Sequence, residues 1–372
     1  MSVEVVDGRF EWIGQASAWQ GNRASIRIID GRARTLIPGL MDCHVHYSSP
    51  GGPDWIAKFT DPLPEISMRA VELAEASLRS GVTTARDVGA PDGVGIRLAR
   101  AARAGEIRAP NIHAAGTWIA HRGTYVPFAR HFGDEKELRD AIRTEIEAGA
   151  DLIKVALAGW NEGSRPRDSA EIPFESNLLT VAVEEAHRSK FKIACHANDP
   201  ASCKIAARAG VDSLEHGMFL EDADLDAMAK NGTFLVPTMS VWDSMQYYAR
   251  IVDWPETRRK RADDLREGSR NSVASAIGKR VPIALGTDAG GGAARHGRIA
   301  REAELMVDCG MQPIQALIAG TSNAARLIGE NERGTIERGK IADMVLLDAD
   351  PLEKIAALRL VAGVFRTGYR LA

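Results

Sequence analysis

The sequence has few cysteines, no charge excess and no long apolar run, and each of these absences excludes a class of protein. Four cysteines without CxxC spacing in 372 residues are too few for a disulfide scaffold, so we expect reduced thiols. The formal charge of −3, from 47 basic and 50 acidic residues, argues against a nucleic-acid partner. No uncharged run reaches the roughly 18 residues that span a bilayer, and the start MSVEVVDGRF lacks the regions of a signal peptide. We therefore predict a cytoplasmic protein without a membrane partner.

The composition is that of a folded protein. Hydrophobic residues make up 45% and charged residues 26% of the chain, which is enough apolar side chain to offset the entropy lost on ordering. A single hydrophobic core usually stops growing at about 250 to 300 residues. The length therefore predicts one large domain with a smaller one or with appendages.

Short β-rich runs alternate with amphipathic helical runs through most of the chain. Helical stretches such as residues 66–80 and 135–148 repeat apolar residues at spacings of three and four, and several such stretches end at a glycine before the next β-rich run. The β-rich runs are residues 36–47, 82–89, 111–116, 152–157, 192–197, 213–217, 233–238 and 282–290. Eight such units over roughly 295 residues are typical of a (β/α)8 TIM barrel. The predicted fold class is therefore α/β, with the barrel at residues 37–332.

The two ends of the chain have a different pattern. Residues 1–36 and 333–372 contain short strand-like runs separated by Gly and Asp, mostly without a helical period. Neither end is long enough to form a stable sheet alone. We expect them to pair into one small β-sandwich domain beside the barrel.

Potential metal ligands stand near the carboxyl ends of the predicted strands, where catalytic groups gather in a barrel. His44 and His46 are two apart, so their side chains point to the same face of a strand. A single histidine at such a position is more often a core residue, but chance does not explain the coincidence on several strands. Imidazole and carboxylate suit borderline divalent cations. The candidate set is His44, His46, Lys154, His196, His216 and Asp288.

These residues lie in motifs that resemble the amidohydrolase superfamily. The resemblance covers nearly the whole chain, and it is greatest to the imidazolonepropionase-like and Xaa-Pro-dipeptidase-like hydrolases. The HxH of the first strand and the GTDAG of the eighth are specific when found together. The motifs are PGLMDCHVH, DLIKVAL, IACHAND, VDSLEHGMF, VPT, LGTDAGGG and the tail GTIERGKIADMVLLDADPL.

The resemblance implies a binuclear centre with two divalent metal ions, expected to be zinc. His44, His46 and Asp288 would hold the buried ion, and His196 and His216 the outer one. Lys154 would be carboxylated and would bridge both ions, because a carbamate offers two anionic oxygens where an ammonium offers no lone pair. A hydroxide bridging the ions would attack the substrate, and Asp288 would be the catalytic residue that moves the proton.

The substrate-binding residues are less clearly marked. The segment after the third strand carries His121, expected to be catalytic or to bind a substrate carbonyl or carboxylate, with Arg122 as an alternative anion binder. Trp160 lies in a segment of about 20 residues after the fourth strand, which is either a lid or a solvated loop. Trp242 follows the seventh strand and is the fourth candidate. The alternative for His121, that it is a loop histidine without a functional role, stays open.

The leading functional hypothesis is the metal-dependent hydrolysis of an amide-type C–N bond in a dipeptide, an N-acyl amino acid or a cyclic amide. A mononuclear aminohydrolase is the alternative, with Asp199 as its acid, and Lys154 discriminates between the two because deaminases do not need it. Hydrolysis of a carbamate, lactone or ester on the same centre, and a non-catalytic assembly protein, are further alternatives. The expected partner is a small-molecule substrate, and the chain is a candidate homo-oligomer.

Overall fold

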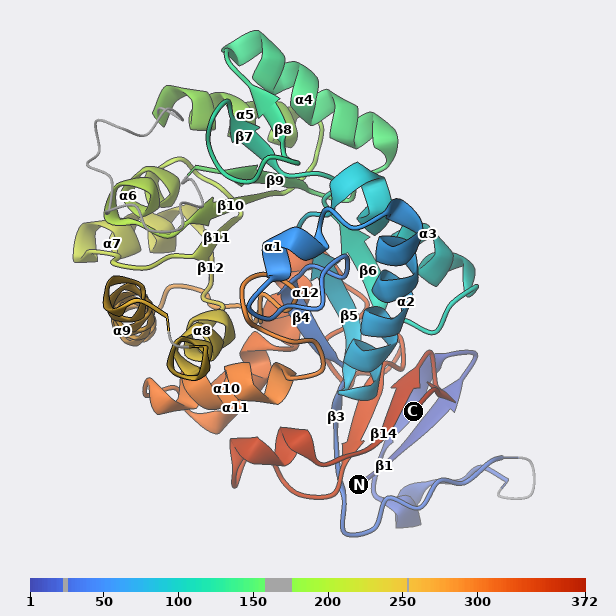
Figure 1. The fold of residues 1–372 in the computed structure, drawn as a ribbon. Coiled ribbons are helices and arrows are strands. Elements are labelled where there is room, and N and C mark those ends of the chain that lie inside the picture. The colour runs from blue at the N-terminus through green and yellow to red at the C-terminus, as the bar shows by residue number, and fades with distance from the viewer. Residues whose placement is uncertain (23–25, 158–175, 253) are drawn as a thin grey trace.

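A computed structural model describes residues 1–22, 26–157, 176–252 and 254–372. The protein is an α/β fold with two parallel sheets and a set of antiparallel strands from the chain ends (Figure 1). The first parallel sheet has the order β4 (Leu40–Val45), β5 (Val82–Asp87), β6 (Asn111–Ala114). The second has the order β12 (Phe234–Val236), β11 (Ser213–His216), β10 (Ile193–Ala197), β9 (Ile153–Ala156), β7 (Ile119–His121), β8 (Arg130–Phe132).

Helices lie around the outside of these strands (Figure 1). Their positions agree with the predicted alternation; the stretch at 135–148, for example, is a helix with these bounds, capped by the Asp134 carboxylate and closed by Gly149 at φ +95°. The helices are α1 (Trp55–Lys58), α2 (Leu63–Arg79), α3 (Val94–Ala104), α4 (Glu135–Ala148), α5 (Ser176–Arg188), α6 (Pro200–Arg208), α7 (Asp222–Asn231), α8 (Met239–Ile251), α9 (Glu256–Gly278), α10 (Ile299–Asp308), α11 (Pro313–Ala319) and α12 (Ser322–Ile328).

Residues 282–290, predicted as the eighth strand, do not form a regular strand. Ile283 makes an isolated parallel bridge to β12, and Ala289 makes one to β4. Asp288 has a φ of +53° and interrupts the extended backbone. The segment still hydrogen-bonds to β4, since Cys43 N donates to Leu285 O at 2.9 Å and Asp288 N donates to His44 O at 2.8 Å. It therefore holds Asp288 beside the end of β4.

Backbone hydrogen bonds also link the two parallel sheets at β6, the strand at the other edge of the first sheet from β4. The amide of Asp151, just before β9, donates to the carbonyl of Ala114 in β6 at 2.7 Å. The strands β7 and β8 were not predicted. They pair parallel at the edge of the second sheet and bring residues 119–132 to the carboxyl ends of the central strands.

Strands from the two ends of the chain pair with each other. Strand β3 (Thr35–Pro38) runs antiparallel to β13 (Met344–Leu347), which continues to β14 (Val361–Arg366) and β15 (Tyr369–Arg370). The hairpin of β1 (Ser2–Val6) and β2 (Arg9–Gly14) shares an apolar cluster with these strands, formed by Phe10, Ala342, Met344, Leu346 and Phe365. Figure 1 shows both termini in this region. The sandwich and the domain boundaries stay predictions.

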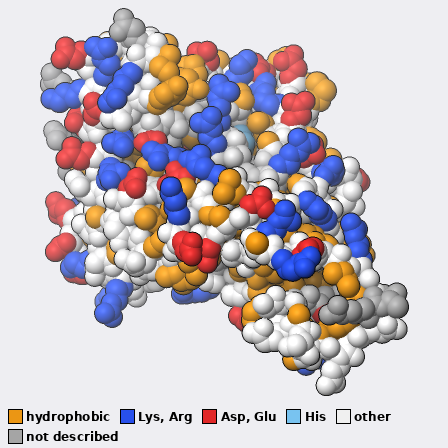
Figure 2. Space-filling model, turned by 90° about the horizontal axis from the view of Figure 1, so that it is seen from below, with side chains coloured by type: hydrophobic (Ala, Val, Ile, Leu, Met, Phe, Trp, Pro, Cys, Tyr) orange, Lys and Arg blue, Asp and Glu red, His pale blue; other side chains and the backbone are white. Residues whose placement is uncertain are grey.

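The surface carries both signs of charge. On the face drawn in Figure 2, basic and acidic side chains are interspersed, in keeping with a net charge of −3. No helix in the described part of the chain is long and apolar enough to cross a membrane.

Candidate metal centre

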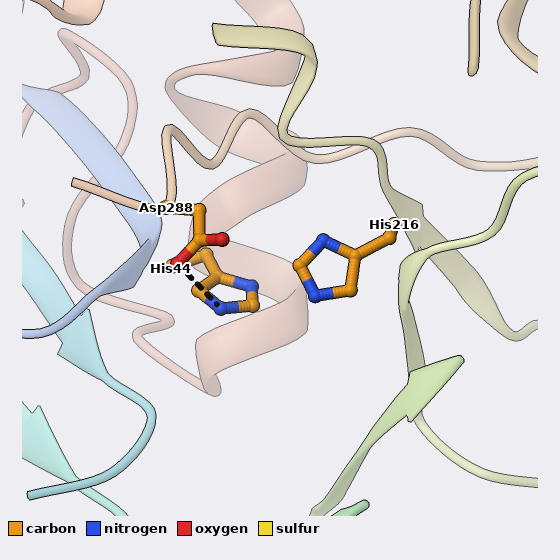
Figure 3. Close-up of side chains that lie close together, drawn as sticks. All are labelled: His44, His216 and Asp288. Carbon is orange, nitrogen blue, oxygen red and sulfur yellow. Dashed lines mark ion pairs between the residues drawn. The ribbon is translucent and has the colours of Figure 1, made fainter. Parts of the chain in front are cut away.

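The structure brings the predicted ligands together at the carboxyl ends of the strands. His44 and His46 come from β4, and Asp288 comes from the irregular eighth segment. Ligand atoms of His44, His216 and Asp288 all lie within 4.8 Å of one another, and Figure 3 shows the three side chains pointing toward a common point. Lys154 from β9, His196 from β10 and His216 from β11 complete the set, and all six side chains are buried.

Both histidines of β4 lie close to the same carboxylate oxygen of Asp288. Oδ1 of Asp288 lies 3.4 Å from Nε2 of His44 and 3.3 Å from Nε2 of His46. The same Oδ1 is buried and has no hydrogen-bond partner in the described part of the chain. A Cβ added to Gly291 would lie 2.0 Å from it, so the absence of a side chain at residue 291 leaves the carboxylate its room. Two imidazole nitrogens and one carboxylate oxygen therefore face one another.

His196 and His216 form a second pair. Nδ1 of His196 lies 2.8 Å from Nε2 of His216, with ring centroids 4.5 Å apart. The other ring nitrogen of His216, Nδ1, lies 2.7 Å from the hydroxyl of Thr238, and Nε2 of His196 is buried without a described partner. The His216 ring is also 5.1 Å from the His44 ring, so the two pairs adjoin.

Lys154 is buried beside both pairs. Its side chain is 1% exposed, and Nζ has no hydrogen-bond partner among the described residues. Burial lowers the pKa of Lys154 to about 8, although the nearby Glu215 carboxylate opposes the shift. A buried, unpartnered amine is costly as a cation, so this position favours a neutral amine or a modified one.

Burial keeps three of the four histidines neutral. It lowers the pKa of His44, His196 and His216 well below 6.5, with a contribution from neighbouring positive groups such as Lys154. A neutral imidazole has a free lone pair, which is the form that binds a metal ion.

Hydrogen bonds at Nδ1 orient the histidines of β4. Nδ1 of His44 donates to Glu215 Oε2 at 2.7 Å, and Nδ1 of His46 donates to the carbonyl of Gly89 at 2.8 Å. Both Nε2 lone pairs then face Asp288. Partners of this kind fix the tautomer and raise the basicity of a metal-binding histidine.

Glu215 belongs to a buried ion pair that the sequence analysis missed. Arg86 of β5 donates to Glu215 Oε1 at 2.7 Å and to the carbonyl of Cys43 at 2.5 Å, and the Ser213 hydroxyl also donates to Oε1. The two charges are nearly inaccessible to solvent. A signal was present, because Arg86 and Glu215 are charged residues inside otherwise apolar strand runs, which need a partner when buried.

Strained backbone explains how neighbouring residues reach the same point. Glu215 and His216 both contact His44, although adjacent side chains of a regular strand point to opposite faces. The φ of +71° at His216 breaks this alternation. Thr238 and Asp288 also have positive φ, at +49° and +53°. Such conformations persist in side-chain-bearing residues where the surrounding structure fixes them, typically at functional sites.

Aromatic side chains flank the ligands. The ring of Trp118 lies 5.3 Å from His46, and the ring of Tyr125 lies 4.9 Å from His196. Trp242 contacts His216 at 5.6 Å, and its indole nitrogen has no partner in the described ranges. Gly89 allows Trp118 to approach, since a Cβ there would lie 2.3 Å from the indole. The predicted substrate contact Trp242 thus lies beside the candidate ligands, together with Trp118 and Tyr125.

Two of the other predicted substrate contacts, His121 and Arg122, have partners outside the candidate ligand set. Nδ1 of His121 lies 3.0 Å from the carbonyl of Arg122, and the Arg122 guanidinium binds the Glu137 carboxylate at 2.6 Å. Trp160 lies outside the described residues. Asp199, the acid of the alternative hypothesis, caps α6 by accepting from Ser202 N at 2.9 Å.

The donor set fits a divalent cation. Neutral imidazoles and a carboxylate converge, and three buried polar atoms lack described partners: Lys154 Nζ, His196 Nε2 and Asp288 Oδ1. Donor atoms that are close together without partners are unfavourable alone, and a bound ion would satisfy them.

The comparisons with known proteins agree with this chemistry. The model of a family described as the Amidohydrolase family matches residues 35–370. An ochratoxinase of Aspergillus niger is 29% identical over 357 residues, which cover 87% of this chain and 72% of that protein. An imidazolonepropionase of Anaeromyxobacter sp. (strain K) is 24% identical over 390 residues, 95% of this chain and 86% of that protein.

Among solved structures, a Xaa-Pro dipeptidase with methionine bound in its active site is similar over nearly the whole chain. It is 29% identical, with a TM-score of 0.87, and the match covers 98% of this chain and 93% of that one. The resemblance predicted from the sequence motifs is thereby confirmed.

Proposed function

Because the chain belongs to the amidohydrolase family and is therefore a hydrolase of carbon–nitrogen bonds, we propose that it uses two divalent metal ions held in a (β/α)8 barrel. The barrel is supported by the backbone hydrogen bonds that join the two parallel sheets through residues 282–290 and through Asp151. His44, His46 and Asp288 would hold one ion, and His196 and His216 the other. Zinc suits this donor set.

One observation carries the proposal. Two pairs of buried histidines adjoin around Asp288, and the Lys154 amine beside them has no hydrogen-bond partner among the residues that the structure describes. A structural role for these side chains would leave their polar atoms paired, since buried polar groups are almost always hydrogen-bonded. The arrangement instead leaves lone pairs directed at a common region.

The ions, when bound, would supply a hydroxide near neutral pH and polarise the substrate carbonyl. The chain's own residues account for the remaining steps. Asp288 lies against Nε2 of both β4 histidines, where it can accept the proton of the attacking water and pass it to the departing nitrogen. Burial of the site excludes bulk water from this proton transfer.

Lys154 is the proposed bridging residue, as a carbamate. Only a neutral amine reacts with carbon dioxide, and a pKa of about 8 leaves part of the Lys154 amine neutral at physiological pH. The product would replace a buried cation by a carbamate with two anionic oxygens next to four histidines. This also removes the cost of an unpaired buried ammonium.

We infer a compact amide as substrate: a dipeptide, an N-acyl amino acid or a cyclic amide. The names of the similar proteins, an ochratoxinase, a Xaa-Pro dipeptidase and an imidazolonepropionase, support this range. We assign Trp242 to the substrate site, and its ring contact with His216 supports this. The roles of His121, Arg122 and Trp160 stay predictions, as do a cytoplasmic location and a homo-oligomer.

A metal-dependent assay tests the proposal. The purified protein is analysed for bound metal and then screened against dipeptides, N-acyl amino acids and cyclic amides, before and after removal of metal by a chelator. We expect two ions per chain and an activity that is lost with the metal and restored by zinc. Activity that is unchanged after complete metal removal contradicts the proposal.

The Lys154→Ala variant tests the bridge. It should bind well under two ions per chain and lose turnover, and short carboxylic acids should partly rescue it by occupying the place of the carbamate. Lys192→Ala is a matched control, because Lys192 also has a pKa lowered by burial but donates to the Arg326 carbonyl away from the ligands. Two tightly bound ions and a normal rate in Lys154→Ala would show that Lys154 is not the bridge.

A further inference from the structure

We propose that Tyr125 is a substrate-contacting catalytic residue, whose hydroxyl donates a hydrogen bond to the oxygen of the scissile carbonyl as that oxygen gains negative charge. The inference rests on the proposed hydrolysis of an amide. It assigns to Tyr125 the carbonyl-binding role that the sequence predicted for His121, four residues earlier in the same segment.

The position of the ring carries the proposal. Tyr125 extends from the segment between β7 and β8, and its ring centroid lies 4.9 Å from that of His196, at an interplanar angle of 60°. His196 belongs to the pair proposed to hold the outer ion. The Asp288 carboxylate is near enough to act electrostatically on the hydroxyl. The hydroxyl is the only polar atom of the Tyr125 side chain, so it is the group that would meet a carbonyl held beside His196.

The backbone holds Tyr125 in a strained conformation. Its φ is +61°, a left-handed conformation that costs a side-chain-bearing residue roughly 1–2 kcal/mol. The preceding turn is fixed, because N and Oγ1 of Thr124 both donate to the carbonyl of His121, and Nε2 of His131 donates to the carbonyl of Thr124. Packing against Trp118, Phe59 and Val126 holds the other side of the residue. An aromatic residue kept in this conformation, where glycine would be unstrained, indicates that its direction matters.

The surroundings favour donation by the hydroxyl over donation by His121. Trp118, just before β7, lies beside His46, so the wall formed by Trp118 and Tyr125 is aromatic apart from the hydroxyl and the indole nitrogen. A hydrogen bond to developing charge is stronger in such an environment than in water. Nδ1 of His121, by contrast, already contacts the carbonyl of Arg122.

The role is consistent with a balanced reaction. The oxygen of water bonds to the carbonyl carbon while the π electron pair of C=O moves to oxygen, and the Tyr125 hydroxyl donates to that oxygen. The C=O bond then re-forms as the C–N bond breaks, and the nitrogen takes the proton held by Asp288. One water is consumed, a carboxylic acid and an amine are released, and Tyr125 keeps its proton throughout.

The test compares Tyr125→Phe with the wild-type holoenzyme on the best substrate of the amide panel. Phenylalanine keeps the ring beside His196 and removes only the hydroxyl. We expect kcat to fall about 10²-fold, as for loss of one donor to an oxyanion, with KM changed less than a few-fold. Metal content and Tm should match the wild type. Tyr247→Phe, at a position 62% exposed on α8, is the matched control and should keep the wild-type kcat.

A binding measurement gives a second readout. A phosphonamidate analogue of the substrate, with tetrahedral anionic oxygens, should bind Tyr125→Phe about 10-fold or more weakly than the wild type, whereas the product amine should bind both equally. An active wild type together with an unchanged kcat and unchanged analogue binding in Tyr125→Phe overturns this inference and leaves the proposed function intact. A wild-type holoenzyme that neither hydrolyses the panel nor binds the analogue overturns the proposed function, and the inference falls with it.

Discussion

Replacing Glu215 by glutamine should weaken both the fold and metal binding, because its two oxygens serve different partners. Oε2 accepts from Nδ1 of His44, while Oε1 accepts from Arg86 and from the Ser213 hydroxyl. Glutamine offers one oxygen and one NH₂ group in the same shape. Whichever way the amide is turned, one N–H group of His44 or Arg86 then faces another donor.

The structure sets the size of the two effects. Glu215 is fully buried, so the variant leaves the Arg86 charge without a counter-ion, a loss of about 3–5 kcal/mol in the free energy of unfolding. A domain in the middle or upper part of the ordinary range of about 5–15 kcal/mol still folds after such a loss. If the NH₂ group of the glutamine faces His44, Nδ1 of His44 also loses the oxygen to which it donates. Loss of this kind of support typically lowers metal affinity about 10- to 100-fold.

Two assays and one compensating variant separate these effects. Denaturant unfolding of the metal-free protein measures stability, and competition with a chelator measures the affinity of each ion. If His44 binds one of two ions as proposed, we expect Glu215→Gln to release that ion at chelator concentrations at which the wild type keeps both.

The double variant Arg86→Met with Glu215→Gln removes the unpaired charge. It should recover stability toward the wild-type value while metal affinity stays low, because His44 still lacks its carboxylate. Wild-type metal affinity in both variants would refute the reasoning that Glu215 prepares His44 for the ion. Wild-type stability in the single variant would refute the reasoning about the buried pair.

The candidate ligand positions could be predicted from the sequence because they follow local rules. His44 and His46 share a face by the alternation of a strand, and His196 stands near the carboxyl end of the apolar run that is strand β10. Lys154 is the one charged residue within the apolar run that is strand β9. Parallel strands place such ends at one edge. The order of parallel strands therefore predicts that these residues lie in a common region, without any measured distance.

The supporting residues depend on contacts between distant parts of the chain. Arg86 and Glu215 are 129 positions apart, and no local pattern states that they pair. The direction of the Tyr125 side chain depends on its left-handed φ. Asp288 also has a left-handed φ, and the strand predicted for its segment is interrupted there. Alternation predicts side-chain direction only while the backbone stays extended. The residues that break it here are those at the site, where His216 and Asp288 turn toward His44.

Two further variants test Asp288 and the pH dependence of the fold. Asp288→Asn keeps an oxygen near both β4 histidines but removes the proposed base. The variant should therefore keep most of its bound metal, while kcat falls about 10²- to 10⁴-fold. A loss in kcat of less than a few-fold assigns the proton transfer to another group. Glu302 is fully buried, and its carboxyl group accepts hydrogen bonds from the backbone amides of Met239 and Ser240. Burial raises the pKa of Glu302 from 4.5 to about 8, although these hydrogen bonds oppose the shift. Between these two values the folded protein holds a proton that the unfolded chain has lost, so the free energy of unfolding should decrease as the pH rises through this window, by up to about 1.4 kcal/mol per pH unit. Denaturant titrations of wild type and Glu302→Gln from pH 5 to pH 9 measure it, since glutamine cannot ionise and should abolish this part of the decrease; parallel curves for the two proteins would show that Glu302 is ionised in the fold and held by its hydrogen bonds.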